Sequence, residues 1–120
     1  MAVRGIRGAI TAAANSEDAI VGATTRLLQE IVVANGVLAA DIAAVFFTTT
    51  PDLNAEFPAA AARALGWRDV PLLCGHEMSV PDRLGSCIRV MMLINTEKGQ
   101  KDVRHVYMDG AASLRPDLDR

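Results

Sequence analysis

The chain has 120 residues and a formal net charge of −2. That length suits one ordinary domain, and the small negative charge argues against a nucleic-acid-binding protein, which usually presents a basic face to the phosphates. The apolar runs are shorter than the ~20 residues that a membrane helix needs, and Arg4 and Arg7 interrupt the apolar start. We therefore expect a single domain over residues 1–120 that binds neither nucleic acid nor a membrane.

The cysteines and the arginines give two weaker indications. Cys74 and Cys87 lie thirteen residues apart, outside any C-x-x-C pair, and the start of the chain does not resemble a signal peptide. This usage is typical of free thiols in a reducing compartment, so we expect a cytoplasmic protein. Ten arginines against two lysines favour a site that grips carboxylates, although GC-rich coding explains the excess equally well.

The expected elements alternate between strands and helices. Runs of β-branched and aromatic residues predict strands over 3–11, 45–50, 70–74, 86–95 and 103–108. Apolar residues at helical spacing predict a first helix that follows a cap at Asn15, with Asp18 at the third position, and ends at Asn35-Gly36. A second helix is expected over 59–65, after Phe57-Pro58.

The remaining segments are expected to be connections: a loop over 75–85, turns at 96–102 and 109–110, and a short turn of helix over 114–118. Two glycines inside the first strand suggest that another element approaches its backbone closely. Together these elements predict an α+β fold, an α/β sandwich in which two main helices pack on one face of a mixed sheet of about five strands.

One charged residue stands inside the most apolar strand. In CIRVMMLI (87–94) the side chains alternate between two faces, and both faces are apolar apart from Arg89. An unpaired charge there costs on the order of several kcal/mol, so Arg89 must meet an anion, a ligand or water. The residues alone slightly favour a buried ion pair with one of the fourteen acidic residues.

Other polar residues with apolar neighbours suggest a ligand-binding site rather than a buried ion pair. Arg7 lies between two glycines, Glu77 follows the third strand close to Cys74, and Tyr107 lies near the end of the fifth strand. Two guanidinium groups, a carboxylate and a phenol would suit a small, polyanionic, hydroxylated substrate. Taken singly, each of these residues fits an ordinary surface or core role better.

Common catalytic signatures are absent from the sequence. His76-Glu77 has no second histidine four residues after the first, so it is not a zinc-binding H-E-x-x-H motif, and there is no P-loop, G-x-S-x-G or G-x-G-x-x-G motif. Only His76 lies near Cys74, which argues against covalent catalysis. His105 is expected to be structural or exposed.

Six blocks of the chain carry a resemblance to a known family. They are RGIRGA (4–9), TPDL (50–53), Phe57 to Ala59 with Arg63, CIRVMM (87–92), RHVY (104–107) and LRPDL (114–118). In their order and near-identical spacing, from about residue 3 to 118, they resemble the monofunctional chorismate mutases of the Bacillus type. The resemblance implies a homotrimer with a pseudo-α/β-barrel core, with active sites between subunits. It also implies the rearrangement of chorismate to prephenate, without cofactor or metal, on the way to phenylalanine and tyrosine.

The resemblance also implies roles for single residues. Arg89 would stabilise negative charge on the breaking ether oxygen, Arg7 would bind a carboxylate, Tyr107 would bond to the enolpyruvyl carboxylate, and Glu77 and Cys74 would hold the ring hydroxyl. Further substrate contacts would come from Phe57 and Ala59 in the apolar wall, Arg63 near the mouth, Leu73, and Leu114-Arg115 in a closing tail.

Two positions depart from the family pattern. Ala60 stands where the family commonly has a lysine near the mouth, and Leu73 replaces a small polar residue. Loss of that lysine is expected to weaken capture of the dianionic substrate by electrostatic steering. Two alternatives stay open: an imine deaminase of the Rid type, which also holds a substrate carboxylate with an arginine, and a non-catalytic carboxylate-binding trimer.

Overall fold

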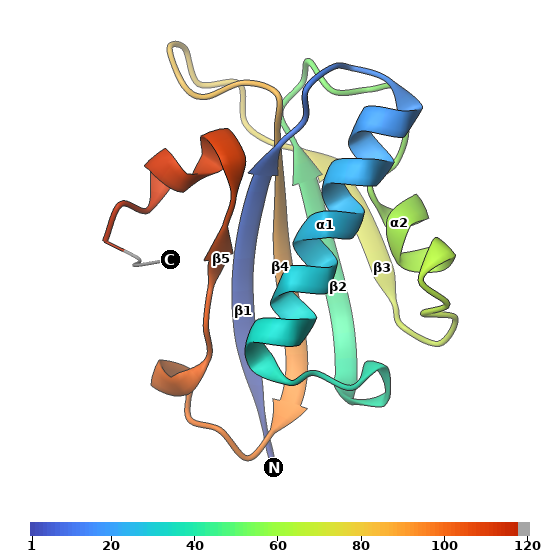
Figure 1. Ribbon diagram of the computed structural model, residues 1–120, viewed down its shortest axis with the longest axis vertical. Helices are drawn as coiled ribbons and strands as arrows, with labels where there is room; N and C mark the ends of the chain where they lie inside the picture. The colour runs from blue at the N-terminus through green and yellow to red at the C-terminus, as the bar shows by residue number, and fades with distance from the viewer. Residues whose placement is uncertain (118–120) are drawn as a thin grey trace.

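The computed structural model describes residues 1–117 and contains a mixed five-stranded sheet (Figure 1). The strands are β1 (Ala2–Thr11), β2 (Ile42–Thr49), β3 (Leu72–His76), β4 (Cys87–Thr96) and β5 (Val106–Tyr107), in the order β3-β2-β4-β1-β5. The central strand β4 runs antiparallel to β1 and β2, whereas the two outer pairs, β1 with β5 and β2 with β3, are parallel. The predicted mixed sheet of about five strands is confirmed.

Both main helices, α1 (Glu17–Asn35) and α2 (Ala59–Ala64), cover the same face of this sheet, as the sequence predicts (Figure 1). The helix cap at Asn15 was predicted wrongly, because the side chain of Ser16 accepts the N–H of Ala19 instead. Gly36 ends α1 in the left-handed conformation, with φ of 61°. Asn15 has another role: its side-chain oxygen accepts the backbone N–H groups of Asn54 and Ala55.

The hydrophobic core lies between the helices and the sheet. Its largest fully buried side chains include Leu27, Leu28 and Ile31 of α1, Ile6 and Ile10 of β1, Phe47 of β2 and Met92 of β4. Burying one such side chain stabilises the fold by about 1.5–3 kcal/mol relative to leaving it in water. We call this side of the sheet the helix face.

At Gly8 of β1, side chains of α1 pack closely on the backbone of the sheet. A Cβ at this position would lie 2.9 Å from Ile31 Cδ1 and 3.1 Å from the carbonyl oxygen of Val106. Real Cβ atoms are not found at the shorter distance, so only glycine fits without a shift of its neighbours. The expected close approach to the first strand is confirmed at this residue.

The opposite face of the sheet, which we call the open face, carries exposed apolar side chains. Val3 is 52% exposed, Phe46 40%, Leu73 63% and Met91 37%. In β2, β3 and β4 these residues alternate with residues that are buried or packed on the helix face, so the sheet is apolar on both sides while α1 and α2 cover only one. Large exposed apolar patches on a sheet usually mark an interaction surface.

β1 and β4 agree with the predicted strands to within one residue at each end, whereas β2, β3 and β5 differ by more. β2 begins at Ile42, three residues earlier than expected, and contains an irregularity between Ile42 and Ala44. β3 is displaced from 70–74 to Leu72–His76, because Pro71 precedes its first residue and Gly75 and His76 still pair with β2.

β5 spans only Val106–Tyr107 because side chains replace backbone partners along the edge of β1. The amide of Gln100 bonds to both the N–H and the carbonyl of Gly5, at 2.9 and 2.7 Å. The N–H of Arg7 donates to His105 Nδ1 at 2.9 Å. The expected strand over 103–108 is therefore mostly a segment bonded through its side chains.

Three short 3-10 helices complete the described chain: η1 (Ala39–Asp41), η2 (Gln100–Asp102) and η3 (Asp109–Leu114). The last one replaces the turn expected at 109–110. η3 ends at Leu114, which is the first residue of the turn of helix expected over 114–118. Residue 118 lies outside the described residues. No helix within residues 1–117 is long and apolar enough to cross a membrane.

Candidate active site

Arg89 lies on the open face of the central strand β4, close to the start of that strand. Its neighbours across the sheet are Thr48 on β2 and Ala9 on β1. The alternate residues of β4, such as Ile88 and Val90, are buried against the helices. Period-two alternation along an apolar strand therefore turns the guanidinium group away from the core, as the sequence pattern predicts.

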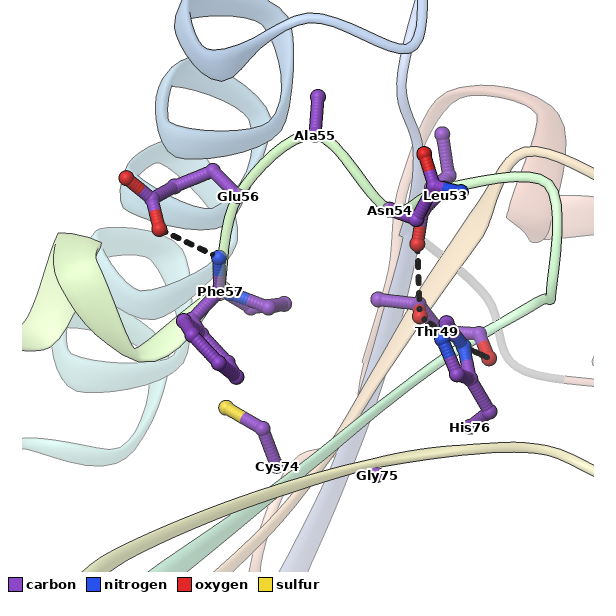
Figure 2. A pocket seen from close by; sticks show the side chains of 10 residues that line it. Thr49, Leu53, Asn54, Ala55, Glu56, Phe57, Cys74, Gly75 and His76 are labelled. Atoms are coloured by element: carbon purple, nitrogen blue, oxygen red, sulfur yellow. Dashed lines mark hydrogen bonds between the residues drawn. The ribbon is translucent and has the colours of Figure 1, made fainter.

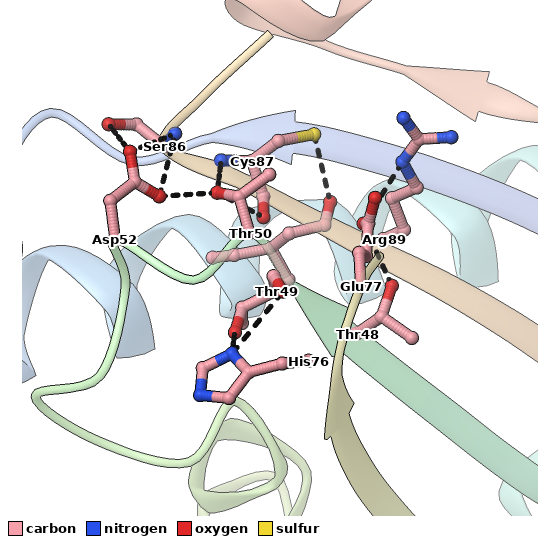
Figure 3. A network of polar contacts seen from close by, with 10 residues as sticks. Thr48, Thr49, Thr50, Asp52, His76, Glu77, Ser86, Cys87 and Arg89 are labelled. Atoms are coloured by element: carbon pink, nitrogen blue, oxygen red, sulfur yellow. Dashed lines mark hydrogen bonds and ion pairs between the residues drawn. The ribbon is translucent and has the colours of Figure 1, made fainter. Parts of the chain in front are cut away.

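Glu77 is the acidic partner of Arg89. It follows β3 directly, and its N–H donates to the carbonyl of Thr49 at 2.9 Å, which fixes the end of the strand. Its Oε2 lies 3.1 Å from Arg89 Nε and accepts the hydroxyl of Thr48 at 2.9 Å (Figure 3). The ion pair expected from the residues alone is thus present, with side chains that are 34% exposed for Arg89 and 18% for Glu77.

The geometry of this pair leaves part of the guanidinium group available. Arg89 Nε is buried, and although the distance makes an ion pair, its N–H does not point at the carboxylate well enough for a hydrogen bond. The two terminal nitrogens point away from Glu77 in Figure 3. Glu77 therefore compensates the charge of Arg89 while the terminal N–H groups face outward.

A cavity of about 640 Å³ opens beside the pair. Its lining includes Glu77, Arg89, Leu84 and Leu114, together with the loop that joins β3 to β4. That size suits a small organic ligand. The cavity combines a cation with apolar walls, the arrangement that strengthens an electrostatic contact with a bound anion.

The other expected residues of this half of the site come from β1, β5 and η3. Arg7 lies on the open face opposite Met91, which makes it a diagonal neighbour of Arg89. Tyr107 pairs with Ala9 and is 4% exposed. The guanidinium carbon of Arg115 lies 5.9 Å from the centre of the Tyr107 ring, which allows a cation–π contact. We call Arg7, Glu77, Arg89, Tyr107, Leu114 and Arg115 the Arg89 group.

The loop between Glu77 and Ser86 is fixed at its second end by the TPDL block. The Asp52 carboxylate accepts the N–H of Ser86 at 2.9 and 3.1 Å and the hydroxyl of Thr50. Thr50 Oγ1 also accepts the N–H of Cys87 at 2.9 Å, at the start of β4 (Figure 3). These bonds, above all the one from Thr50, hold the pKa of Asp52 below its usual value. The block therefore fixes the strand that carries Arg89.

The remaining expected residues gather around α2. Phe57 and Cys74 face each other across a second cavity of about 380 Å³ (Figure 2). Burial raises the pKa of the Cys74 thiol, and this outweighs the lowering by the Ala59 backbone amide and by the charge of Arg63. The thiol is therefore neutral near pH 7 and suited to hydrogen bonding rather than nucleophilic attack. We call Phe57, Ala59, Arg63 and Cys74 the Phe57 group.

The two groups lie on different sides of the sheet within one chain. Cys74 and Glu77 are three residues apart along extended backbone, so Cys74 packs against the core on the helix face whereas Glu77 reaches Arg89 on the open face. Among residues 1–117, neither of the two cavities is lined by both groups. Leu73, also expected at the site, is exposed on the open face and lines neither cavity.

Sequence reasoning missed one polar residue of the site, Thr48, and one long-range contact, between Asp52 and Ser86. Thr48, which contacts Glu77, shares the period-two alternation of β2 and could have been placed opposite Arg89 once the strand register was known. The link from Asp52 to Ser86 spans 34 residues, and no local pattern indicates it. Within residues 1–117, no group of three His, Cys, Asp or Glu side chains is arranged to hold a metal ion.

Comparison with known proteins identifies the family of the chain. Residues 3–118 match the family model described as chorismate mutase type I. Chorismate mutase AroH of Thermus thermophilus is 50% identical over 118 residues, covering 98% of this chain and 97% of the relative. Chorismate mutase AroH of Bacillus subtilis (strain 168) is 44% identical over 119 residues, covering 98% and 94%.

A solved structure extends the likeness to the fold. The chorismate mutase from Clostridium thermocellum superposes with a TM-score of 0.91 at 49% identity, over 92% of this chain and 98% of the other. Sequence and structure thus agree over nearly the whole length. The chain belongs to the chorismate mutase type I family.

Proposed function

We propose that this protein converts chorismate to prephenate, a step toward phenylalanine and tyrosine, and that Arg89 is the group that lowers the barrier. In this unimolecular rearrangement the ether bond breaks ahead of carbon–carbon bond formation, so negative charge grows on the ether oxygen. A cation fixed near that oxygen stabilises the transition state more than the substrate. The supporting observation is an arginine held by Glu77 with its terminal nitrogens directed outward beside a cavity.

The other members of the Arg89 group would bind the substrate. Arg7 and Tyr107 would contact its carboxylates, and Leu114 and Arg115 would close over it. Glu77 would accept a hydrogen bond from the ring hydroxyl. Holding the substrate in its folded, diaxial conformer contributes separately, because it replaces a rare solution geometry with a fixed one.

We further propose a homotrimer in which the Phe57 group of one subunit completes the site of its neighbour. Two observations support this arrangement. The open face exposes Phe46, Leu73 and Met91, which an adjoining subunit would cover. Within residues 1–117, no member of the Phe57 group lines the cavity beside Arg89.

One assay tests the proposed reaction. The purified protein is incubated with chorismate, the loss of ultraviolet absorbance is followed, and acid then converts any prephenate to phenylpyruvate. Arg89→Ala should lower kcat about a hundredfold or more, the scale of losing one oxyanion donor, without unfolding the protein. The matched control is Arg68→Ala, which removes an exposed arginine outside both groups.

The outcomes separate the candidate functions. Prephenate from the wild type, lost in Arg89→Ala, supports the proposal. Wild-type turnover by a folded Arg89→Ala protein would contradict the role of the arginine. Tight binding without turnover would indicate a carboxylate-binding protein, and activity on 2-imino acids alone would indicate a deaminase.

A further inference from the structure

Thr48 contacts the proposed catalytic pair from the neighbouring strand. It begins a run of three threonines, Thr48 to Thr50, whose side chains alternate between the faces of the sheet. In the register of β2 with β4, Thr48 lies directly opposite Arg89. Its hydroxyl donates to Glu77 Oε2 at 2.9 Å, whereas Thr49 bonds to Leu53 on the helix face.

In the described part of the chain, the hydrogen bond and the ion pair of the Glu77 carboxylate converge on one of its two oxygens. Oε2 receives the Thr48 hydroxyl and lies 3.1 Å from Arg89 Nε. Within residues 1–117, the only side-chain hydrogen bond to this carboxylate goes to Oε2, so Oε1 stays available to a ligand. Glu77 can therefore hold the arginine and contact a substrate hydroxyl at the same time.

Thr48 supplies the directional contact that Arg89 does not. The Arg89 Nε–H is within ion-pair distance of the carboxylate but is poorly aligned for a hydrogen bond, and Coulomb attraction alone does not fix an orientation. The chain after Glu77 offers little further restraint, since Met78 is 86% exposed and Val80 44%. Among residues 1–117, the Thr48 hydroxyl makes the one directional side-chain hydrogen bond to this carboxylate.

We propose that Thr48 is a positioning residue for the rearrangement: through Glu77 it holds Arg89 at the angle at which its free N–H groups meet the developing charge. This inference rests on the proposed function of Arg89. Because the positioning matters most when charge has developed, its loss should lower kcat more than it raises KM.

The test compares two replacements that differ in one group. Thr48→Val keeps the branched shape and suits a strand but removes the hydroxyl, whereas Thr48→Ser keeps the hydroxyl. We expect Thr48→Val to lower kcat about tenfold with KM within about twofold, and Thr48→Ser to stay within about twofold of wild type in both. Thr24→Val is the matched control, because it makes the same change at a buried threonine of α1 whose hydroxyl bonds to the carbonyl of Ile20.

A second readout does not depend on turnover. The Nε–H of Arg89 is buried, so in the wild type its proton should exchange slowly with solvent in ¹⁵N NMR spectra. Exchange should be faster in Thr48→Val and unchanged in Thr48→Ser and Thr24→Val. Should Thr48→Val fold poorly, Thr48→Ala gives the same comparison with a smaller side chain.

Three results would each overturn the proposed role of Thr48. Wild-type kcat in folded Thr48→Val, equal losses in the valine and serine variants, or unchanged Nε–H exchange would each contradict it. A wild-type protein without any chorismate turnover would instead contradict the proposed function, and the exchange measurement would still test the contact between Thr48, Glu77 and Arg89.

Discussion

The two faces of the sheet use similar residues for different purposes. On the helix face, Ile88, Val90 and Met92 of β4 are almost fully buried and hold the chain together. On the open face, the same strand presents Arg89 and the partly exposed Met91. A strand can thus be apolar throughout while its side chains on one face, beyond the buried Cys87, stay partly exposed in a single chain. That face is available for assembly and for chemistry.

The adjacent residues Phe47 and Phe46 test this difference most strongly. Phe47 is 1% exposed on the helix face, so Phe47→Ala should lower the free energy of unfolding by about 3–5 kcal/mol through lost burial and a cavity. Phe46 is 40% exposed on the open face, and Phe46→Ala should instead weaken subunit association. Urea unfolding and analytical ultracentrifugation measure the two effects. Equal destabilisation of both variants at every protein concentration would contradict the distinction.

Mixing two inactive variants tests whether the Arg89 group of one subunit and the Phe57 group of another form one active site. Arg89→Ala damages the Arg89 group, with an expected loss of about a hundredfold in kcat, and Arg63→Glu damages the Phe57 group. After joint unfolding and refolding of equal amounts, about one site in each mixed trimer, or about a quarter of all sites, should combine two intact halves and regain activity. Two copies of the same variant, treated identically, provide the control. No recovery in verified mixed trimers would place both halves of the site in one subunit.

Gly8 and Gly5 of β1 allow the packing on the helix face and on the open face to be compared, with a smaller expected change in stability. An alanine at Gly8 would meet Ile31, Leu27 and backbone on the helix face, so Gly8→Ala should cost about 1–3 kcal/mol of stability. At Gly5, on the open face, the nearest atom is Met91 Sδ at 3.2 Å, and a flexible thioether can move aside. Gly5→Ala should therefore cost less than Gly8→Ala in thermal unfolding, and the reverse order would contradict the packing described for α1.

The smallest expected effect concerns pH. The pKa of Asp52 is lowered in the folded state, chiefly by the hydrogen bond from the Thr50 hydroxyl. The ionised carboxylate therefore stabilises the fold at pH values above the ordinary pKa of an aspartate. This stabilisation is lost as the pH falls through the lower pKa of Asp52 in the folded protein. The stability difference between wild type and Asp52→Asn should be constant near neutral pH and shrink below about pH 4. Urea unfolding across this range measures it. A difference independent of pH would exclude a role for the charge.

Local patterns predicted most of the fold. The alternation along 87–94 correctly placed Arg89 on the face opposite Ile88 and Val90, and Gly36 correctly marked the end of α1. The same alternation could not say which face the helices cover, because both sets of side chains are apolar. Strand ends were less predictable, since β3 depends on its pairing with β2 and β5 is short because His105 and Gln100 bond to β1 through side chains.

The candidate site was predictable only in part. Blocks of sequence indicated the residues of both groups, and the cost of a charge in an apolar strand predicted an ion pair for Arg89 without indicating that its partner is Glu77. The separation of Cys74 from Glu77 required the strand register, and the contact of Thr48 with Glu77 joins segments 29 residues apart. Such contacts depend on the tertiary arrangement rather than on neighbouring residues.

The side-chain bonds along β1 also affect how the protein behaves toward other chains. A strand edge with free N–H and carbonyl groups is a template on which further strands can add, and this is a common start of fibril growth. Here the amide of Gln100 occupies both backbone groups of Gly5, and the imidazole of His105 occupies the N–H of Arg7. At Gly5 and Arg7 the edge of β1 beyond the two-residue β5 is thereby closed to the addition of another strand.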